Sequence, residues 1–309
     1  MAMRVALFGG TGFVGSYLVD ALVDAGLHPV VLVRSGHESR VNHPNDCTLV
    51  TGDVTDPKAI AGTLSDCDAA IYNIGILREF PSKGITYNTL QLDAVRQIVD
   101  AAKQAGVGRF LLMSANGVKA DGTPYQATKY EAEQYLKASG LDWTVFRPSV
   151  IFGDPGERME FATQLANDII RSPLPAPLFF DGVVPVNAGQ FRLSPVHVED
   201  VAQAFVRSLG SANTTGKTYH LGGDDALTWQ QILTTIADAI DKKKIMLPVP
   251  ALGVRLAAGA LDRFEAFPIT RDQINMLMQG NTCPSDDLKS LDITPQRFTS
   301  DSLCYLATQ

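Results

Sequence analysis

The feature that most constrains the fold of this chain is a glycine-rich turn near its amino terminus. Gly9, Gly12 and Gly15 are spaced three residues apart, directly after the apolar run 4–8 and directly before an amphipathic stretch at 13–25. Glycines let the backbone approach a pyrophosphate closely, and the amino terminus of the following helix presents N–H groups and the positive end of its dipole. This context predicts a dinucleotide-binding loop, whereas the alternative is a turn kept only for packing. The expected cofactor contacts in the loop are Gly9, Thr11, Gly12, Phe13, Val14 and Gly15.

Short apolar runs alternate with helical patterns through the first half of the chain. The runs lie at residues 4–8, 29–33, 48–51, 69–73, 110–113 and 144–146, and helical spacing of apolar residues separates most of them, as at 13–25 and 90–105. Such alternation is typical of βαβ units. We therefore expect an α/β fold with a Rossmann-type, doubly wound parallel sheet.

The alternation of short apolar runs and helical patterns ends after about residue 150. Prolines at 173, 175, 177 and 185 exclude one long helix there, and 193–198 followed by 199–209 predicts one more strand and helix that rejoin the first domain. Helical patterns at 228–240, 252–264 and 270–278 dominate the remainder. We expect a dinucleotide-binding domain of residues 1–150 and 191–221, and a smaller, mostly helical substrate domain of residues 151–190 and 222–309.

Composition excludes several classes of function. The 26 Lys and Arg against 33 Asp and Glu give a net charge of −7, and no basic run is longer than Lys242 to Lys244, so we expect no nucleic-acid partner. The four cysteines are far apart, without metal-ligand spacing, so neither a metal nor disulfides are expected. No apolar stretch is long enough for a membrane span, and Met1 to Arg4 lead straight into the first apolar run. We expect a cytoplasmic protein, with a membrane-peripheral location as the alternative.

The end of the second predicted strand indicates which dinucleotide binds. Folds of this type that prefer NAD carry an acidic residue there, which binds the ribose 2′-hydroxyl, but here the position holds Arg34. A guanidinium suits a 2′-phosphate and offers no acceptor to a hydroxyl. NADP(H) is therefore favoured over NAD(H), and the alternative is an arginine that stacks on the adenine or faces solvent.

The ends of the next two strands add further candidate contacts. Asp53 and Val54 follow the third strand, where an aspartate can reach the adenine amino group, and Asn73 and Gly75 follow the fourth, beside the expected ribose. Each pair alone would more often be an ordinary turn. Together they fall at the carboxyl ends of consecutive strands, where ligands bind in open α/β sheets.

A tyrosine and a lysine four residues apart suggest catalysis. Tyr125 and Lys129 lie on one face of a helix that starts just after Pro124, and an ammonium near the phenol is expected to lower the pKa of the phenol. Ser114 ends the fifth strand and could orient a substrate oxygen. In isolation, a tyrosine and a lysine at this spacing are more often a solvated pair.

Together, these residues resemble the short-chain dehydrogenase/reductase superfamily, in its extended and atypical form that includes nucleotide-sugar epimerases. Within it, the tail resembles the accessory subunit of mitochondrial complex I and its bacterial relatives. The matching segments are residues 9–15, Asp53, Asn73 to Gly75, Ser114, Tyr125 to Lys129, 147–153, 195–201, 221–223, 227–229, 248–250 and 270–273.

The resemblance implies both a site and a function. It implies Ser114, Tyr125 and Lys129 as catalytic residues, Lys129 also as a cofactor contact, and Pro148 and Ser149 near the nicotinamide. The implied protein is an NAD(P)-dependent oxidoreductase or epimerase/dehydratase-like enzyme acting on a carbonyl or alcohol of a small molecule. The alternative is a non-catalytic NADPH-binding protein that supports a respiratory complex or quinone metabolism.

The segment 250–267 is largely apolar, with Leu256, Leu261 and Phe264 among few charges. We expect a helix there that covers the substrate cleft. The alternative is an interfacial helix at a membrane surface.

Overall fold

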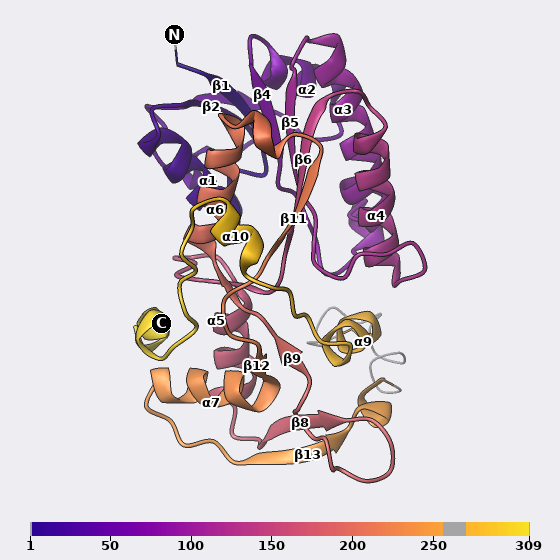
Figure 1. The fold of residues 1–309 in the computed structure, drawn as a ribbon, viewed down its shortest axis with the longest axis vertical. Helices are drawn as coiled ribbons and strands as arrows, with labels where there is room; N and C mark the ends of the chain where they lie inside the picture. The colour runs from indigo at the N-terminus through magenta and orange to yellow at the C-terminus, as the bar shows by residue number, and fades with distance from the viewer. Residues whose placement is uncertain (1, 256–269, 309) are drawn as a thin grey trace. The chain divides into compact units, whose positions relative to one another are not determined.

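The computed structural model describes residues 2–255 and 270–308, and the chain divides into two compact units (Figure 1). The first unit comprises Met1–Pro148, Val198–Leu221 and Asp286–Thr294, and the second comprises Ser149–His197, Gly222–Ser285 and Pro295–Gln309. Residues 256–267 of the apolar segment predicted at 250–267 lie outside the described residues.

Within the described residues of the first unit, seven parallel strands form one sheet in the order β11-β6-β5-β4-β1-β2-β3. The strands are β1 (Arg4–Phe8), β2 (His28–Val33), β3 (Thr48–Thr51), β4 (Ala69–Tyr72), β5 (Arg109–Met113), β6 (Asp142–Pro148) and β11 (Lys217–Leu221). The direction of winding reverses between β1 and β4. The expected doubly wound Rossmann-type sheet is therefore confirmed.

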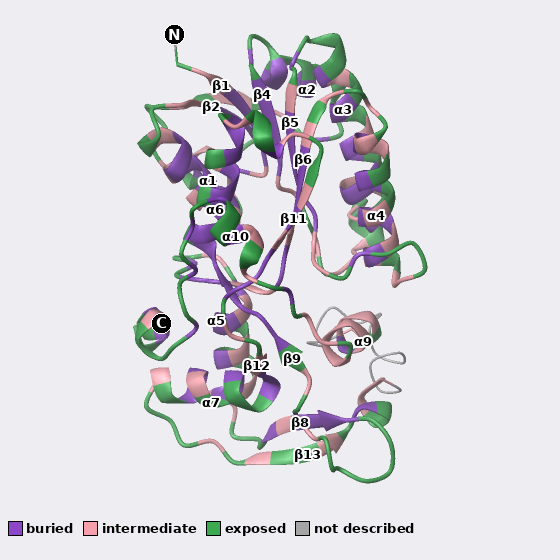
Figure 2. Cartoon of the chain, viewed as in Figure 1, coloured by how far each residue is buried: buried purple, intermediate pink, exposed green. Residues whose placement is uncertain are grey.

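Helices cover both faces of this sheet. They are α1 (Phe13–Asp24), α2 (Pro57–Leu64), α3 (Ala94–Gln104), α4 (Pro124–Lys137), α6 (Val198–Leu209) and the short α10 (Asp286–Ser290). Helices α1 and α6 pack together on one face, and α2, α3 and α4 line the other (Figure 1). Because both faces are covered, the central strands are almost wholly apolar and buried (Figure 2). Phe8 and Phe110 join the core beneath α2 to α4.

The second unit is built of short elements. Its described residues include the helices α5 (Phe161–Leu165), α7 (Trp229–Ala239) and α9 (Arg271–Met278). Among these residues, three two-stranded ladders pair β7 (Ile151–Phe152) with β10 (Val196–His197), β8 (Ala176–Phe180) with β13 (Met246–Pro250), and β9 (Arg192–Leu193) with β12 (Leu227–Thr228). Trp229 is buried in the core of this second unit, and its indole N–H donates to the Pro177 carbonyl at 2.9 Å. Among the described residues of the whole chain, no helix is long and apolar enough to cross a membrane.

Short 3₁₀ or π turns also occur in the part of the chain that the structure describes. They are η1 (Glu38–Arg40), η2 (Pro81–Lys83), η3 (Asn88–Asp93), η4 (Ala166–Ile170), η5 (Ala212–Thr214) and η6 (Asp301–Ala307).

The single strand predicted at 193–198 does not form. It is divided into β9 and β10, which belong to different ladders of the second unit, and only the helix that follows returns to the first unit. Pro195 lies between the two short strands and has no backbone N–H to donate to a ladder. The additional strand of the first unit is β11, which lies at the edge of its sheet.

Candidate nucleotide-binding and catalytic site

The glycine turn forms a close-packed loop between β1 and α1. Gly9 has φ +102°, a conformation that side chains rarely adopt, and a Cβ at Gly15 would lie 2.0 Å from the Gly9 carbonyl oxygen. Gly12 precedes α1 without a side-chain cap. The backbone N–H groups of the first turn are therefore not covered by a capping side chain, as a pyrophosphate would require. The loop thus fits the diphosphate of a dinucleotide.

Arg34 follows β2 at the same end of the sheet. Its side chain is exposed and forms no hydrogen bond or ion pair with any other described residue, while its carbonyl accepts the His37 N–H at 3.0 Å in a turn. The preceding Val33 is buried, so the guanidinium stands where the sheet meets solvent. This leaves its donors available to an anionic ligand.

Asp53 and Val54 follow β3 as an ordinary turn. One carboxylate oxygen of Asp53 accepts from both the backbone N–H of Thr55, at 3.0 Å, and its hydroxyl, at 2.7 Å. Val54 is buried and Asp53 is exposed. An adenine contact would therefore use the second oxygen of Asp53.

Lys129 connects the ends of two neighbouring strands. Its ammonium donates to the carbonyl of Met113, the last residue of β5, at 3.2 Å, and lies 3.6 Å from where a Cβ of Gly75 would stand, just beyond β4. Asn73 continues β4 through its N–H, which donates to Phe8 at 2.9 Å. The glycine at 75 thus keeps the space above the lysine free of a side chain.

Tyr125 lies one turn before Lys129 on α4. Thr123 and Gln126 fix the start of this helix through a reciprocal capping box, and the Lys129 ammonium is 5.7 Å from the centroid of the Tyr125 ring. The ring of Tyr87 packs edge-on against that of Tyr125, with centroids 5.8 Å apart. The pair predicted from the spacing is therefore assembled, and Lys129 is buried rather than solvated.

The pKa values of Tyr125 and Lys129 differ from those expected from their spacing alone. Burial, assisted by Tyr87, raises the pKa of Tyr125 above its usual value, so the prediction that Lys129 lowers it is wrong. Burial also lowers the pKa of Lys129 to about 8, against an opposing effect of Glu133. Near neutral pH the phenol therefore keeps its proton and the amine is mostly charged.

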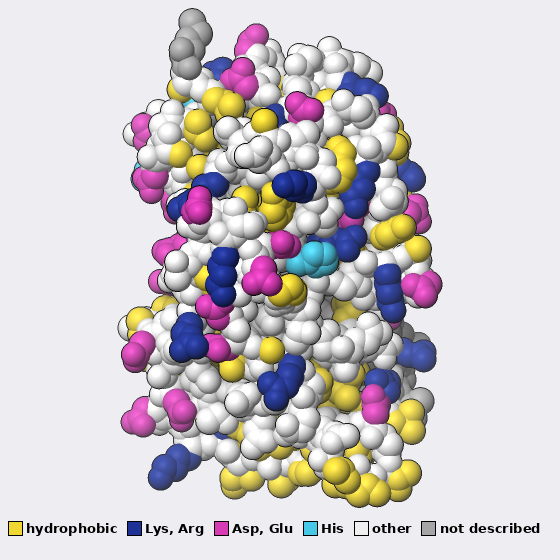
Figure 3. All heavy atoms as spheres, in the orientation of Figure 1, with side chains coloured by type: hydrophobic (Ala, Val, Ile, Leu, Met, Phe, Trp, Pro, Cys, Tyr) yellow, Lys and Arg dark blue, Asp and Glu magenta, His cyan; other side chains and the backbone are white. Residues whose placement is uncertain are grey.

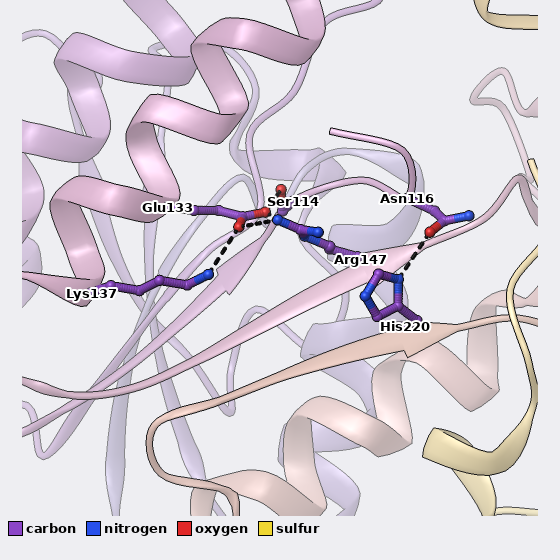
Figure 4. Close-up of polar contacts among 6 residues, drawn as sticks. All are labelled: Ser114, Asn116, Glu133, Lys137, Arg147 and His220. Atoms are coloured by element: carbon purple, nitrogen blue, oxygen red, sulfur yellow. Dashed lines mark hydrogen bonds and ion pairs between the residues drawn. The ribbon is translucent and has the colours of Figure 1, made fainter. Parts of the chain in front are cut away.

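Ser114 contacts a residue that sequence reasoning missed. Its hydroxyl donates to one carboxylate oxygen of Glu133 at 2.5 Å (Figure 4). Among the described residues, no hydrogen bond joins Ser114 to Tyr125. Arg147 holds the carboxylate in a fork, with Nε 2.8 Å and Nη2 2.6 Å from its two oxygens, and Lys137 lies 3.3 Å away.

The pKa of Glu133 is lowered in this cluster. Burial alone would raise it, but hydrogen bonds from Arg147 and Ser114 and the nearby cations outweigh burial. The i, i+4 series of Lys129, Glu133 and Lys137 on one face of α4 could have identified this buried acid.

A second polar contact lies beside this cluster in the first unit. The His220 Nδ1 of β11 is 2.9 Å from the Asn116 side-chain oxygen, and the Asn116 N–H donates to the carbonyl of Pro148 at 2.8 Å (Figure 4). Ser149 belongs to the second unit, where its hydroxyl donates to the carbonyl of Asn281 at 2.7 Å.

Comparison with known proteins agrees with this fold and loop. Residues 9–169, just over half of the chain, match the NAD(P)H-binding family. A ceramide reductase from Caulobacter vibrioides is 31% identical over 264 residues, covering 83% of this chain and 76% of that protein. The mitochondrial 40 kDa subunit of NADH-ubiquinone oxidoreductase from Neurospora crassa is 24% identical over 308 residues, covering 97% of this chain and 78% of the subunit.

A solved structure shares the fold over nearly its whole length. The UDP-glucose 4-epimerase of Thermus thermophilus, in complex with NAD, superposes with a TM-score of 0.73 at 19% identity, covering 99% of this chain and 98% of that one. Fold, glycine loop and relatives define an epimerase- and reductase-like Rossmann protein of the short-chain dehydrogenase/reductase type. The chain belongs to the NAD(P)H-binding family.

Proposed function

We propose that this chain is an NADPH-dependent reductase that converts a carbonyl group of an apolar small molecule to an alcohol. The observation that carries the proposal is the place of the Lys129 ammonium, between the Tyr125 ring and the open strand end at Gly75. A proton donor and a cation thus lie at the carboxyl ends of β4 and β5, where ligands bind in open α/β sheets. When bound, the nicotinamide ring supplies the hydride.

Near neutral pH the phenol of Tyr125 is protonated, as the general acid of a reduction must be. Reduction adds a hydride to the carbonyl carbon and a proton to its oxygen, and a phenol with a raised pKa holds the proton that this step consumes. Oxidation of an alcohol would need the phenolate, which burial disfavours. Tyr125 therefore acts as the general acid in this proposal, and Lys129 binds the cofactor ribose beside it.

Ser114 accepts a hydrogen bond from the alcohol product in this proposal. Because its proton is directed to Glu133, the lone pairs of the hydroxyl remain to accept a hydrogen bond. The alcohol product, or the phenol of Tyr125, can supply that donor. Ser114, Tyr125 and Lys129 are thus the proposed catalytic residues.

Two features support the choice of cofactor and substrate class. The exposed Arg34 guanidinium suits the 2′-phosphate of NADPH. The other proposed cofactor contacts are Gly9, Thr11, Gly12, Phe13, Val14, Gly15, Asp53, Val54, Asn73, Gly75, Pro148 and Ser149. The apolar substrate class rests on the Caulobacter relative, whose name is ceramide reductase.

A second candidate is a nucleotide-binding protein without turnover, associated with a respiratory complex. The observation that favours it is the Neurospora subunit, whose match spans 97% of this chain. A cytoplasmic or membrane-peripheral location is compatible with either candidate.

The test is NADPH oxidation by purified protein, followed by absorbance, with long-chain ketones and aldehydes, an amide-bearing lipid ketone, a short-chain ketone and a quinone. We expect turnover with at least one long-chain carbonyl, and Tyr125→Phe should lower it by about 10²- to 10⁴-fold with unchanged NADPH affinity. Tyr87→Phe is the matched control, since the Tyr87 hydroxyl is bonded to the Leu77 carbonyl at 3.0 Å. Tight NADPH binding without turnover on any carbonyl would favour the second candidate.

A further inference from the structure

Six apolar side chains of the second unit are exposed around the β8–β13 ladder. These residues, the apolar patch, are Leu174, Val183, Val184, Val186, Ile245 and Leu247. Val183 is 97% exposed and Val186 is 78% exposed. In Figure 3, hydrophobic side chains gather along the lower edge of the view, over β8 and β13. Single exposed apolar residues are normal, but a contiguous group usually marks a binding surface.

Backbone contacts attach the three segments of the patch to the same ladder. The Ala176 N–H donates to the Ile245 carbonyl at 2.8 Å, so the residues that lead into β8 and β13 run side by side. The loop after β8, which carries the three valines, returns to its strand where the Gly189 N–H donates to Phe179 at 2.9 Å. The segments at 174 and 245–247 therefore lie at the start of the parallel ladder, and the valine loop follows its other end.

A basic segment adjoins the apolar patch. Lys242 and Lys243 are exposed directly before Ile245, and Lys244 is anchored to the carbonyl of Ser172. Asp241 is the one acidic residue in the segment 241–250. Asp181, at the start of the valine loop, is neutralised by Arg255 at 2.7 Å. On a chain with a net charge of −7, this edge therefore carries local positive charge.

We propose that the apolar patch and Lys242 to Lys244 form a docking surface for an anionic lipid bilayer. Protein interfaces are enriched in aromatic residues and arginine and depleted in lysine, whereas this surface has aliphatic side chains next to lysines. That combination matches a membrane interface, where aliphatic side chains enter the acyl boundary and lysines meet anionic headgroups. The inference concerns the second unit and does not depend on turnover at the nucleotide site.

The experiment is co-sedimentation of the full chain with phosphatidylcholine vesicles, with and without a quarter of phosphatidylglycerol. We expect binding to the anionic vesicles that exceeds binding to the neutral ones. Val183→Glu with Val186→Glu should weaken binding to both by about tenfold or more, because two apolar side chains lose their burial. Lys242→Glu with Lys243→Glu should weaken only the anionic case, by at least about fivefold per lysine.

Matched controls separate this surface from general effects. Met159→Glu changes another exposed apolar residue of the same unit, and Lys58→Glu with Lys103→Glu reverses two exposed charges of the first unit. Both controls should bind like the wild type, and NADPH titration shows whether each variant is folded. Wild-type protein that stays in the supernatant with both vesicles would overturn the proposal. Valine variants that bind vesicles normally but dissociate an oligomer in light scattering would also overturn it, in favour of a second copy of the chain.

Discussion

The hydroxyl of Ser114 donates to the carboxylate of Glu133 across 2.5 Å, from the end of β5 to the middle of α4. The carboxylate has no exposed surface, and Arg147 of β6 completes its hydrogen bonds. The buried Glu133 carboxylate thereby links Ser114 to α4, which carries the acid, and to β6, which carries Arg147. A hydroxyl fixed in this way keeps its lone pairs free to accept from an alcohol only as long as the ion pair that holds it is intact.

Glu133→Gln should destabilise the protein by about 3–5 kcal/mol, because it leaves the Arg147 guanidinium without a counter-charge. Urea unfolding of the two proteins measures this difference. Adding Arg147→Met to the Glu133→Gln variant should recover part of the loss, since the pair is then replaced rather than broken.

The matched control for this substitution is Glu131→Gln, on the same helix. Glu131 is exposed and pairs with Arg96 at 3.6 Å, so its loss should cost less than about 1 kcal/mol. Equal effects at the two positions would contradict the role given to the buried carboxylate.

Arg34→Glu should reverse the preference between the two dinucleotides. The loss of charge-assisted hydrogen bonds to a 2′-phosphate corresponds to about 1.5–3 kcal/mol, or roughly 10- to 150-fold in the dissociation constant of NADPH. The affinity for NADH should stay the same or rise, because a carboxylate accepts from the ribose hydroxyl. Fluorescence titration with each nucleotide measures both values, with Lys103→Glu as a surface-charge control. Equal affinity of the wild type for the two nucleotides would disprove the role of Arg34.

Lys129→Met should show the pH dependence of a buried amine. The pKa of Lys129 is about 8 when folded and near 10.5 when unfolded, so the unfolded state binds more protons between these values. The free energy of unfolding of the wild type should therefore rise, relative to Lys129→Met, by about 3 kcal/mol from pH 7 to above pH 10.

Urea unfolding of both proteins across this range measures that difference, and Lys137→Met, with a partly exposed amine, provides the control. In the wild type alone, NADPH affinity should also fall as pH rises through 8, because the ammonium loses its charge. A constant difference in stability between wild type and Lys129→Met would show that the amine is not buried in its charged form.

Several elements of the fold could be predicted from sequence because their causes are local. β1 and β3 begin and end at the predicted residues, since short apolar runs bounded by turn residues define buried strands. β11 was not predicted, because residues 217–221 mix polar and apolar side chains as an edge strand can. The strand predicted at 193–198 failed for a different reason, since the two ladders that divide it join segments far apart in the chain.

The sequence by itself determined the dinucleotide loop, because its causes lie within seven residues. Gly9 adopts the positive φ of the turn, and Gly15 lets the helix backbone pass close to the Gly9 carbonyl. It also determined that Tyr125 and Lys129 share a helix face, which the helical period requires. Only the tertiary structure decided that Ser114 bonds to Glu133 and that the pKa of Tyr125 rises. Both depend on burial and on partners from other elements, Arg147 for the carboxylate and Tyr87 for the phenol, and charge energies in a protein interior follow from such long-range packing.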